Sequence, residues 1–275
     1  MKVALLQLCS SDDPAANLEK TLSFIEQATK NGAQFIATPE VTNCVSTSRR
    51  HQVAILAQQQ DDKTLTALRQ TARKFGVWIA IGSLALKLPN DDRFTNRSFM
   101  ISPMGEIVAQ YDKIHMFDVT LSETEKYRES DGYRAGEKAV LATTEFGQIG
   151  MTICYDIRFP GLYRKVAQAG ASIILIPAAF AQPTGQAHWE VLLRARAIET
   201  GCFVIAAAQT GTHPSSEGKS RKTYGHSMVV SPWGEILADG GIEQGIVTCE
   251  LDLSLVQTAR GRVPSILSNQ SFSGP

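Results

Sequence analysis

The chain has 275 residues, of which 43% are hydrophobic, and its 27 Lys and Arg side chains balance its 27 Asp and Glu side chains. This composition has no basic excess and no apolar run of about 18 residues, so it argues against a nucleic-acid partner and a membrane span. The five cysteines are irregularly spaced and form no C-x-x-C, which argues against a disulfide framework or a zinc knuckle and favours a reducing, cytoplasmic location.

The N-terminal segment MKVALLQLCSSDDP predicts a first strand, because its apolar run is too short for a signal peptide with a cleavage site. A helix follows, with Asp13 as its N-cap, Pro14 at its first position and Gly32 at its end. The predicted buried face of this helix consists of Leu18, Leu22, Ile25 and Ala28.

Three segments of the first half return in the same order in the second half. The pairs are GAQFIATPE (32–40) with GASIILIPA (170–178), GVWIAIG (76–82) with GCFVIAA (201–207), and SFMISPMGEIVA (98–109) with SMVVSPWGEILA (227–238). Chance could supply one such match, but three matches in one order indicate an internal duplication. The chain therefore consists of two pseudo-repeated halves.

Helix patterns separate the repeated strands, at 62–76 in the first half and at 161–170 and 188–201 in the second. Each half thus reads β-α-β-α-β-β, with helices over one face of its sheet and an apolar face left open. Two such halves bury their apolar faces against each other. We therefore expect an α/β fold, a four-layer αββα sandwich, in which residues 1–275 form a single domain.

Residues 114–140 have no counterpart in the other half, and this segment is polar. We expect it to be a loop. A loop this long in a compact domain is usually functional or disordered.

Reactive side chains follow three of the predicted strands, namely Glu40, Lys113 and Cys154. Ligand sites of α/β sheets form beyond the carboxyl ends of strands, so packing of the two halves could bring these groups into one pocket. There Glu40 could take the proton of a nucleophilic Cys154, and Lys113 could hold an oxyanion together with the N–H of Tyr155.

Glu129, in the polar segment, could pair with Lys113 and set its position. Residue types alone also allow Cys154 to be an inert core residue and the Glu and Lys side chains to be ordinary solvated turn residues.

The motifs around these residues resemble those of the nitrilase (carbon–nitrogen hydrolase) superfamily. They are TPE at Glu40, YDKIHMFD at Lys113, YRES at Glu129 and GMTICYDIRFP at Cys154. The resemblance covers nearly the whole chain. It implies the αββα fold, a homodimer, a Glu40–Lys113–Cys154 triad with Glu129 as a second glutamate, and catalysis that needs no metal or organic cofactor.

Within the superfamily, GQAHWEVLLRARAIETGCFVIAAAQTG and YGHSMVVSPWGEILA are similar to the Nit-type amidases. This similarity implies a small α-keto-acid amide as substrate, with deaminated glutathione hydrolysed to 2-oxoglutarate and cysteinylglycine through a thioester. The alternatives are an ω-amidase acting on α-ketoglutaramate, a nitrilase or other C–N hydrolase, and a non-catalytic binding member. The polar stretch THPSSEGKSRKTYG receives no role, and EVTNCVSTS after Glu40 is less typical of the family.

The carboxylate of such a substrate needs a cation, and Arg158 lies four residues after Cys154. Arg158 could bind it bidentately, although an ordinary salt bridge at a helix start is an equal alternative. Phe180 and Thr184, in the loop AAFAQPTG, could line the same pocket, with core packing as the alternative for Phe180.

His115, His188 and His226 raise the alternative of a papain-like Cys–His pair, but none lies in a thiol-protease signature. A His-based mechanism would survive the loss of Lys113.

Overall fold

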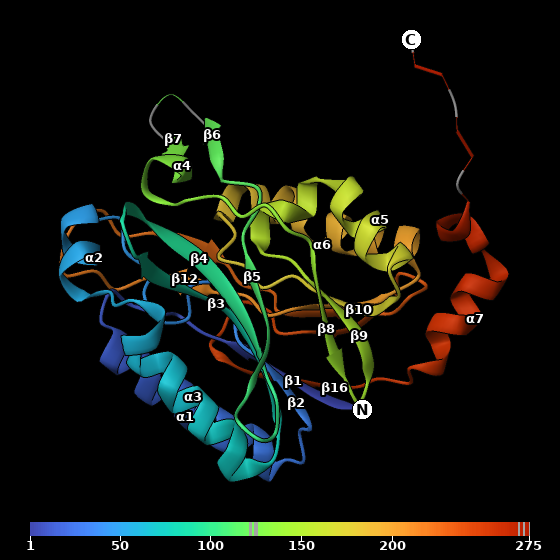
Figure 1. The fold of residues 1–275 in the computed structure, drawn as a ribbon, viewed down its shortest axis with the longest axis horizontal. Coiled ribbons are helices and arrows are strands. Elements are labelled where there is room, and N and C mark those ends of the chain that lie inside the picture. Colours follow the sequence, from blue (N-terminus) through green and yellow to red (C-terminus); the bar gives the residue numbers. More distant parts are fainter. Residues whose placement is uncertain (121–122, 124–125, 269, 272, 275) are drawn as a thin grey trace.

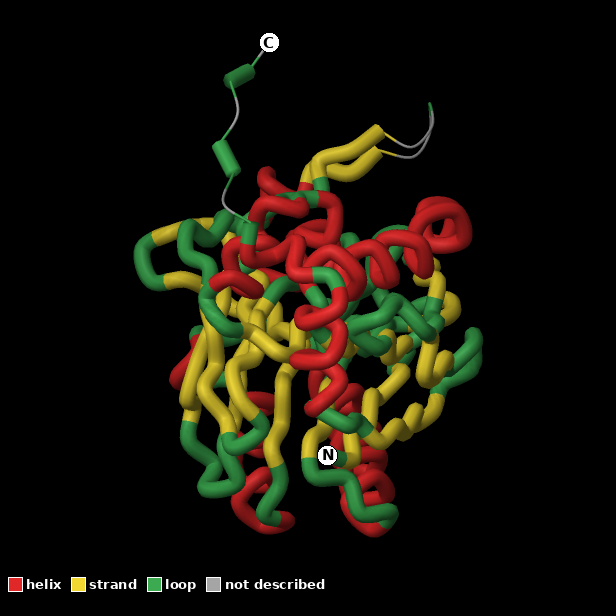
Figure 2. Tube along the Cα trace, turned by 90° about the vertical axis from the view of Figure 1, so that its right-hand side faces the viewer, coloured by secondary structure: helices red, strands yellow, loops and turns green. Residues whose placement is uncertain are grey.

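Two sheets lie face to face between two layers of helices in the computed structural model (Figure 1). The structure describes residues 1–120, 123, 126–268, 270–271 and 273–274. The tube view, turned by 90°, shows the strands in the middle and the helices outside them (Figure 2). The predicted αββα sandwich is therefore confirmed. Within the described part of the chain, no helix is both long enough and apolar enough to cross a membrane.

The elements of the first half are β1 (Lys2–Gln7), α1 (Pro14–Lys30), β2 (Phe35–Ala37), α2 (Arg49–Ile55), the 3₁₀ helix η1 (Gln59–Asp61), α3 (Lys63–Phe75), β3 (Trp78–Leu88), β4 (Asp91–Ile101) and β5 (Ile107–Asp112). Between the halves lie β6 (Asp118–Thr120), β7 (Lys126–Arg128) and α4 (Glu129–Gly132).

The elements of the second half are β8 (Val140–Thr144), β9 (Gly147–Met151), η2 (Cys154–Arg158), α5 (Pro160–Gln168), β10 (Ala171–Leu175), α6 (Gln182–Thr200), β11 (Phe203–Ala206), β12 (Thr210–Thr212), β13 (Lys222–Tyr224), β14 (Met228–Val230), β15 (Ile236–Asp239), β16 (Gly245–Glu250), α7 (Ser254–Arg262) and η3 (Pro264–Leu267).

The two six-stranded sheets repeat one strand order. The first sheet runs β16-β1-β2-β3-β4-β5 and the second, read in the same sense, runs β8-β9-β10-β11-β14-β15. The three sequence repeats fall on matching strands, so the duplication and the sheets agree. The first sheet takes its outer strand, β16, from the far end of the chain, where it pairs antiparallel with β1 as β8 pairs with β9.

Alternating side chains of β1 face two different cores. Val3 and Leu5 belong to the core that also contains Met151 of the second sheet. Ala4 and Leu6 pack instead with the apolar side chains of α1 and α3. Each face of the strand is therefore buried, as expected for parallel strands covered on both sides.

Helix α1 begins as predicted, since the Asp13 carboxylate accepts hydrogen bonds from the N–H groups of Ala15 and Ala16. Its buried face differs in part from the prediction. The buried positions are Asn17, Thr21, Phe24, Ile25 and Ala28, whereas Leu18 and Leu22 are only half-buried. The face is rotated toward Asn17 because the amide of this residue bonds the carbonyls of Ser11 and Asn43.

The expectation that residues 114–140 form a loop is wrong in part. Strands β6 and β7 form a hairpin that projects from the body beside α4 (Figure 1). Val119 of β6 pairs with Tyr127 of β7, and the ring of Phe117 packs 5.1 Å from the Tyr127 ring. These local pairings order a segment with few apolar residues. Residues 121, 122, 124 and 125 lie outside the described part.

Helix α6 begins at Gln182, earlier than the expected 188, because Pro183 occupies its first turn. His188, expected to begin this helix, therefore lies in its interior.

Candidate active site

A cavity of about 900 Å³ opens beyond the ends of β2, β5 and β9. Its lining includes four of the residues singled out by the sequence, Glu40, Lys113, Glu129 and Cys154. The two halves therefore bring these side chains together. Residues of the β6–β7 hairpin and of the segment 218–222 line the same cavity.

The Glu40 carboxylate is buried and has a hydrogen-bond donor on each oxygen. Oε1 accepts from Lys113 Nζ at 2.9 Å and from Asn96 Nδ2 at 2.9 Å. Oε2 accepts from the Ala179 N–H at 2.8 Å, which comes from the second half of the chain. Burial raises the pKa of this carboxyl, but the charges of Lys113 and Arg221 outweigh it, and the pKa lies below its usual range. Glu40 is therefore ionised and could accept a proton.

The Lys113 ammonium lies between two carboxylates. Its Nζ is 2.9 Å from Glu40 Oε1 and 2.8 Å from Glu129 Oε2. Burial opposes the charged form, but Glu129 and Glu40 raise the pKa of Lys113 well above its ordinary value. Glu129 is itself positioned by the Phe117 N–H, which donates to Oε2 at 2.6 Å. Glu129 thus holds a permanently charged Lys113 beside Glu40.

Cys154 begins the 3₁₀ helix η2 in a left-handed conformation, with φ of 47°. Val41, directly after Glu40, also has φ of 47°. Such backbone is rare for residues with a Cβ, and it costs on the order of 1–3 kcal/mol where surrounding contacts maintain it. The Cys154 N–H donates to the Pro177 carbonyl at 2.9 Å, which fixes the turn. Any backbone donor for an oxyanion must therefore come from beyond Cys154, beginning at Tyr155.

The Cys154 thiol is 6% exposed, and its pKa is raised well above the ordinary value. Burial is the largest cause, the Glu40 charge adds to it, and Lys113 opposes both. The Lys113 charge would favour a thiolate, but burial and the Glu40 charge outweigh it. The resting group is a thiol next to an ionised carboxylate, so it could act as a nucleophile only if its proton moved to that carboxylate.

Asn96 and Asp156 are among the residues at this site that the sequence reasoning missed. Asn96 of β4 donates to Glu40 at 2.9 Å and to Glu129 Oε1 at 3.3 Å, so it joins the two carboxylates. Asp156, which is fully buried, accepts from the Ile153 N–H at 2.9 Å and the Tyr111 hydroxyl at 2.7 Å. Asn96 lies among other polar residues of β4, so the sequence carried no signal for it, whereas Asp156 could have been noticed as an acidic residue within the CYDIRFP motif.

The remaining predicted site residues divide into two groups. Tyr155 and Phe180 line the cavity. Arg158 does not line it. Its guanidinium hydrogen-bonds His188 Nδ1 at 3.2 Å and lies 5.5 Å from the centre of the Phe180 ring.

Thr184 does not line the cavity either. Pro183 places it in the first turn of α6, where its hydroxyl donates to the Ala181 carbonyl at 3.3 Å.

The histidines considered as alternatives are engaged elsewhere. His115 Nδ1 lies 2.6 Å from Asp156 Oδ1, and its ring stacks on Phe159 at 3.6 Å. His226 bonds Asp239 at 3.0 Å. Among the described residues that line the cavity there is no histidine. The geometry therefore favours Glu40 over a histidine as the base.

The described residues contain no group of three or more His, Cys, Asp or Glu side chains arranged to hold a metal ion. All five cysteines are free thiols.

Comparison with known proteins agrees with this geometry. The model of the family described as carbon-nitrogen hydrolase matches residues 2–261. The chain is 41% identical over 276 residues to a deaminated glutathione amidase of Yersinia enterocolitica, covering 98% of this chain and 93% of the relative.

Solved structures show the same fold. The C. elegans NitFhit protein superposes with a TM-score of 0.89 at 35% identity; the match covers 98% of this chain, which spans only 64% of the NitFhit chain. A mutant of the amidase from Nesterenkonia sp. AN1 superposes with a TM-score of 0.78 at 26% identity, covering 96% of this chain and 98% of the other. That structure is described as showing Michael addition of acrylamide at the active-site cysteine.

Proposed function

The chain belongs to the carbon–nitrogen hydrolase family, and from this premise we propose that it cleaves the amide of deaminated glutathione through a thioester on Cys154. It is a hydrolase of carbon–nitrogen bonds other than peptide bonds. The identity to the Yersinia deaminated glutathione amidase over nearly its whole length supports the substrate.

One observation carries the mechanism: Glu40, Lys113 and Cys154 line one cavity, in which the pKa of Glu40 is lowered and the pKa values of Lys113 and Cys154 are raised. In the first step Glu40 takes the thiol proton while the sulfur attacks the amide carbon. The carbonyl oxygen becomes an oxyanion, which the Lys113 ammonium and the Tyr155 N–H stabilise. Protonation of Glu40 weakens its ion pair with Lys113, so the ammonium is available to the oxyanion.

Collapse of the tetrahedral intermediate breaks the C–N bond. Glu40 returns its proton to the nitrogen, and cysteinylglycine leaves as an amine. The 2-oxoglutaryl thioester on Cys154 is then attacked by a water whose proton passes to Glu40. The sulfur leaves, recovers the proton and regenerates the thiol, and 2-oxoglutarate is released.

Glu129 acts through Lys113 in this scheme. It contacts the ammonium with both oxygens and keeps one carboxylate on Lys113 when Glu40 is protonated. Asn96 similarly stays on both glutamates throughout the cycle. These two residues are positioning residues, whereas Glu40, Lys113 and Cys154 contact the reacting atoms.

A side-by-side assay of deaminated glutathione, α-ketoglutaramate and a simple nitrile tests the function, with Cys154→Ala as the blank. We expect the highest kcat/KM for deaminated glutathione. Preference for α-ketoglutaramate would assign the chain to the ω-amidases, and turnover of the nitrile alone would make it a nitrilase. No Cys154-dependent turnover of any of them would favour a non-catalytic binding protein.

A homodimer is part of the proposal. Val191 and Ile198 on α6 are 66% and 56% exposed, and Trp233 in the β14–β15 turn is 51% exposed. Exposed apolar side chains that gather on one face are typical of subunit contacts. Light scattering at micromolar concentration should give twice the monomer mass.

A single domain over residues 1–275 and a cytoplasmic location complete the proposal. The free cysteines support the cytoplasmic location.

A further inference from the structure

The polar stretch that received no role from the sequence forms the end of the β12–β13 hairpin. Thr210–Thr212 pairs antiparallel with Lys222–Tyr224, and the connecting residues reach the cavity. Lys219, Arg221 and Lys222 are among the residues that line it. This hairpin therefore brings three cations to a site whose catalytic groups come from other elements.

Arg221 differs from its two lysine neighbours, which are exposed. Its Nη2 donates to the Ala179 carbonyl at 2.6 Å, and the N–H of Ala179 donates to Glu40 at 2.8 Å. The backbone of one residue, Ala179, thus links the guanidinium to the proposed base. The Arg221 Nε is buried and finds no acceptor among the residues that the structure describes. A buried donor without an acceptor is costly, so an acceptor from a ligand would be favourable.

The charges of the cavity are not balanced. Lys113 forms ion pairs with two carboxylates of the lining, those of Glu40 and Glu129. The other charged side chains of the lining are all cations: Lys126, Arg128, Lys219, Arg221 and Lys222. The charge of Arg221 acts on both Glu40 and Cys154. A substrate with a carboxylate fits this excess.

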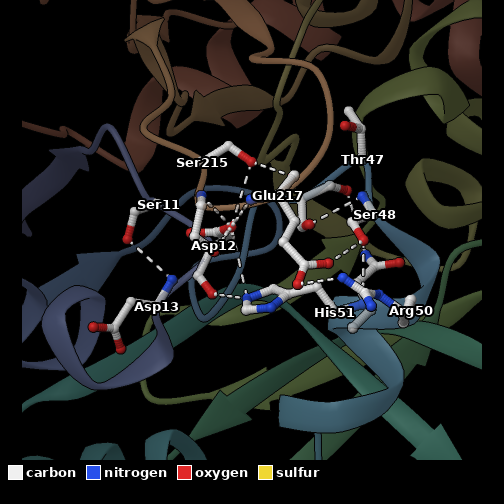
Figure 3. Close-up of polar contacts among 12 residues, drawn as sticks. Ser11, Asp12, Asp13, Thr47, Ser48, Arg50, His51, Ser215 and Glu217 are labelled. Atoms are coloured by element: carbon white, nitrogen blue, oxygen red, sulfur yellow. Dashed lines mark hydrogen bonds and ion pairs between the residues drawn. The ribbon is translucent and has the colours of Figure 1, made fainter.

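Contacts with the first half of the chain hold the hairpin in place (Figure 3). Asp12 Oδ2 accepts from the Ser216 N–H and hydroxyl, each at 2.7 Å. Glu217 accepts from Arg50 at 2.8 Å and from the Ser48 hydroxyl at 3.2 Å. The anchoring places Arg221 at the cavity before any substrate arrives, which reduces the entropy lost on binding.

We propose that Arg221 is a specificity-determining residue that binds a carboxylate of the substrate through its guanidinium. The proposal rests on the proposed function for the identity of the substrate. Deaminated glutathione carries one carboxylate on its 2-oxoglutaryl part and one on its cysteinylglycine part, and the guanidinium chemistry suits either. Arg221 lines the cavity, whereas Arg158 does not.

The test measures binding of the two products separately, by calorimetry, to full-length protein carrying Cys154→Ala. We expect 2-oxoglutarate or cysteinylglycine to bind, and Arg221→Gln to weaken that binding by about 10- to 100-fold, the effect of losing a charge-assisted hydrogen bond. The product affected identifies the end of the substrate that Arg221 holds. Arg221→Lys should restore only part of the affinity, because an ammonium lacks the planar fork.

Two further variants show whether the effect is specific. Lys219→Gln removes a charge from the same hairpin and should weaken binding less than about threefold, since an exposed charge is screened. Arg158→Gln tests the alternative arginine. The inference is overturned if neither product binds the parent, if Arg221→Gln binds as tightly as the parent, or if only Arg158→Gln weakens binding. Turnover of deaminated glutathione by the wild type separately tests the proposed function, so the two can fail independently.

Discussion

The Ala179 N–H donates to Glu40 Oε2 at 2.8 Å, and this bond joins a backbone group of one half of the chain to the proposed base of the other. Ala179 follows β10 and Glu40 follows β2, and these two strands are counterparts in the duplicated sheets. The site therefore exists only where the two halves meet. Perturbing that junction should affect catalysis and stability together.

Replacing Lys113 by Ala should lower kcat by at least about 10²–10³, because the oxyanion loses a charged donor. The variant also leaves the buried Glu40 and the partly buried Glu129 without their cation, and breaking a buried ion pair typically costs about 3–5 kcal/mol of stability. Steady-state kinetics on protein shown to be folded by circular dichroism checks the first effect, and urea unfolding checks the second. Near wild-type turnover would favour a histidine-based mechanism instead.

Glu129→Gln keeps the shape of the side chain but removes one of the two charges that hold Lys113. We expect kcat to fall by about 10- to 100-fold with little change in KM, since Lys113 is left less well placed for the oxyanion. The matched control is Glu137→Gln, which neutralises an exposed glutamate outside the cavity. A rise in KM alone would show that Glu129 contacts substrate rather than positioning Lys113.

Gly82 of β3 lies at the junction of the halves, and Ala should not fit there. A Cβ at this position would come within 2.1 Å of the Thr38 carbonyl oxygen and 2.6 Å of Pro177 Cβ. We expect Gly82→Ala to cost roughly 3 kcal/mol or more and to reduce kcat, because the segments that carry Glu40 and Cys154 must shift. Gly161→Ala in α5 is the control: nothing lies within 4 Å of its Cβ, and its stability should change by no more than about 1 kcal/mol. If the Gly82→Ala and Gly161→Ala variants were equally stable, the close packing of Gly82 against Thr38 and Pro177 would be contradicted.

His213 should make the protein sensitive to mild acid. Burial lowers the pKa of this histidine to about 4 from its ordinary 6.5, and Arg221 adds to the effect. The unfolded chain therefore binds a proton at a higher pH than the folded protein does. The contribution to stability is complete above pH 6.5, is lost as the pH falls from 6.5 to about 4, and amounts to roughly 3 kcal/mol.

Urea unfolding at several pH values measures this dependence. The stability of the wild type should fall as the pH drops from 6.5 to about 4, and the stability of the His213→Gln variant should fall much less. The exposed His188 provides the control, since His188→Gln should keep the wild-type slope. A His213→Gln variant with an unchanged slope would show that other groups cause the acid sensitivity.

The sequence was informative where a pattern is repeated or local. The duplication predicted both sheets, and Asp13 with Pro14 predicted the start of α1. It could not reveal β16 as the outer strand of the first sheet, because that pairing joins the two ends of the chain. The short β6–β7 hairpin was missed because its strands have three residues each and no long apolar pattern.

The same distinction applies to the site. Motifs and strand ends pointed to Glu40, Lys113 and Cys154, and the structure places all three in one cavity. Asn96 and Arg221 were missed because their roles come from contacts across the fold: Asn96 reaches residues 56 and 33 positions away, and Arg221 reaches a carbonyl 42 positions away. Spacing along the chain carries no signal for such contacts.

The most direct test of the account looks for the covalent intermediate on Cys154. Wild-type protein turning over deaminated glutathione is quenched in acid, digested and analysed by mass spectrometry. We predict a 2-oxoglutaryl group on the peptide that contains Cys154, and neither adduct nor turnover with Cys154→Ala. Turnover that persists in Cys154→Ala, or an acyl group found only on another residue, would contradict the account.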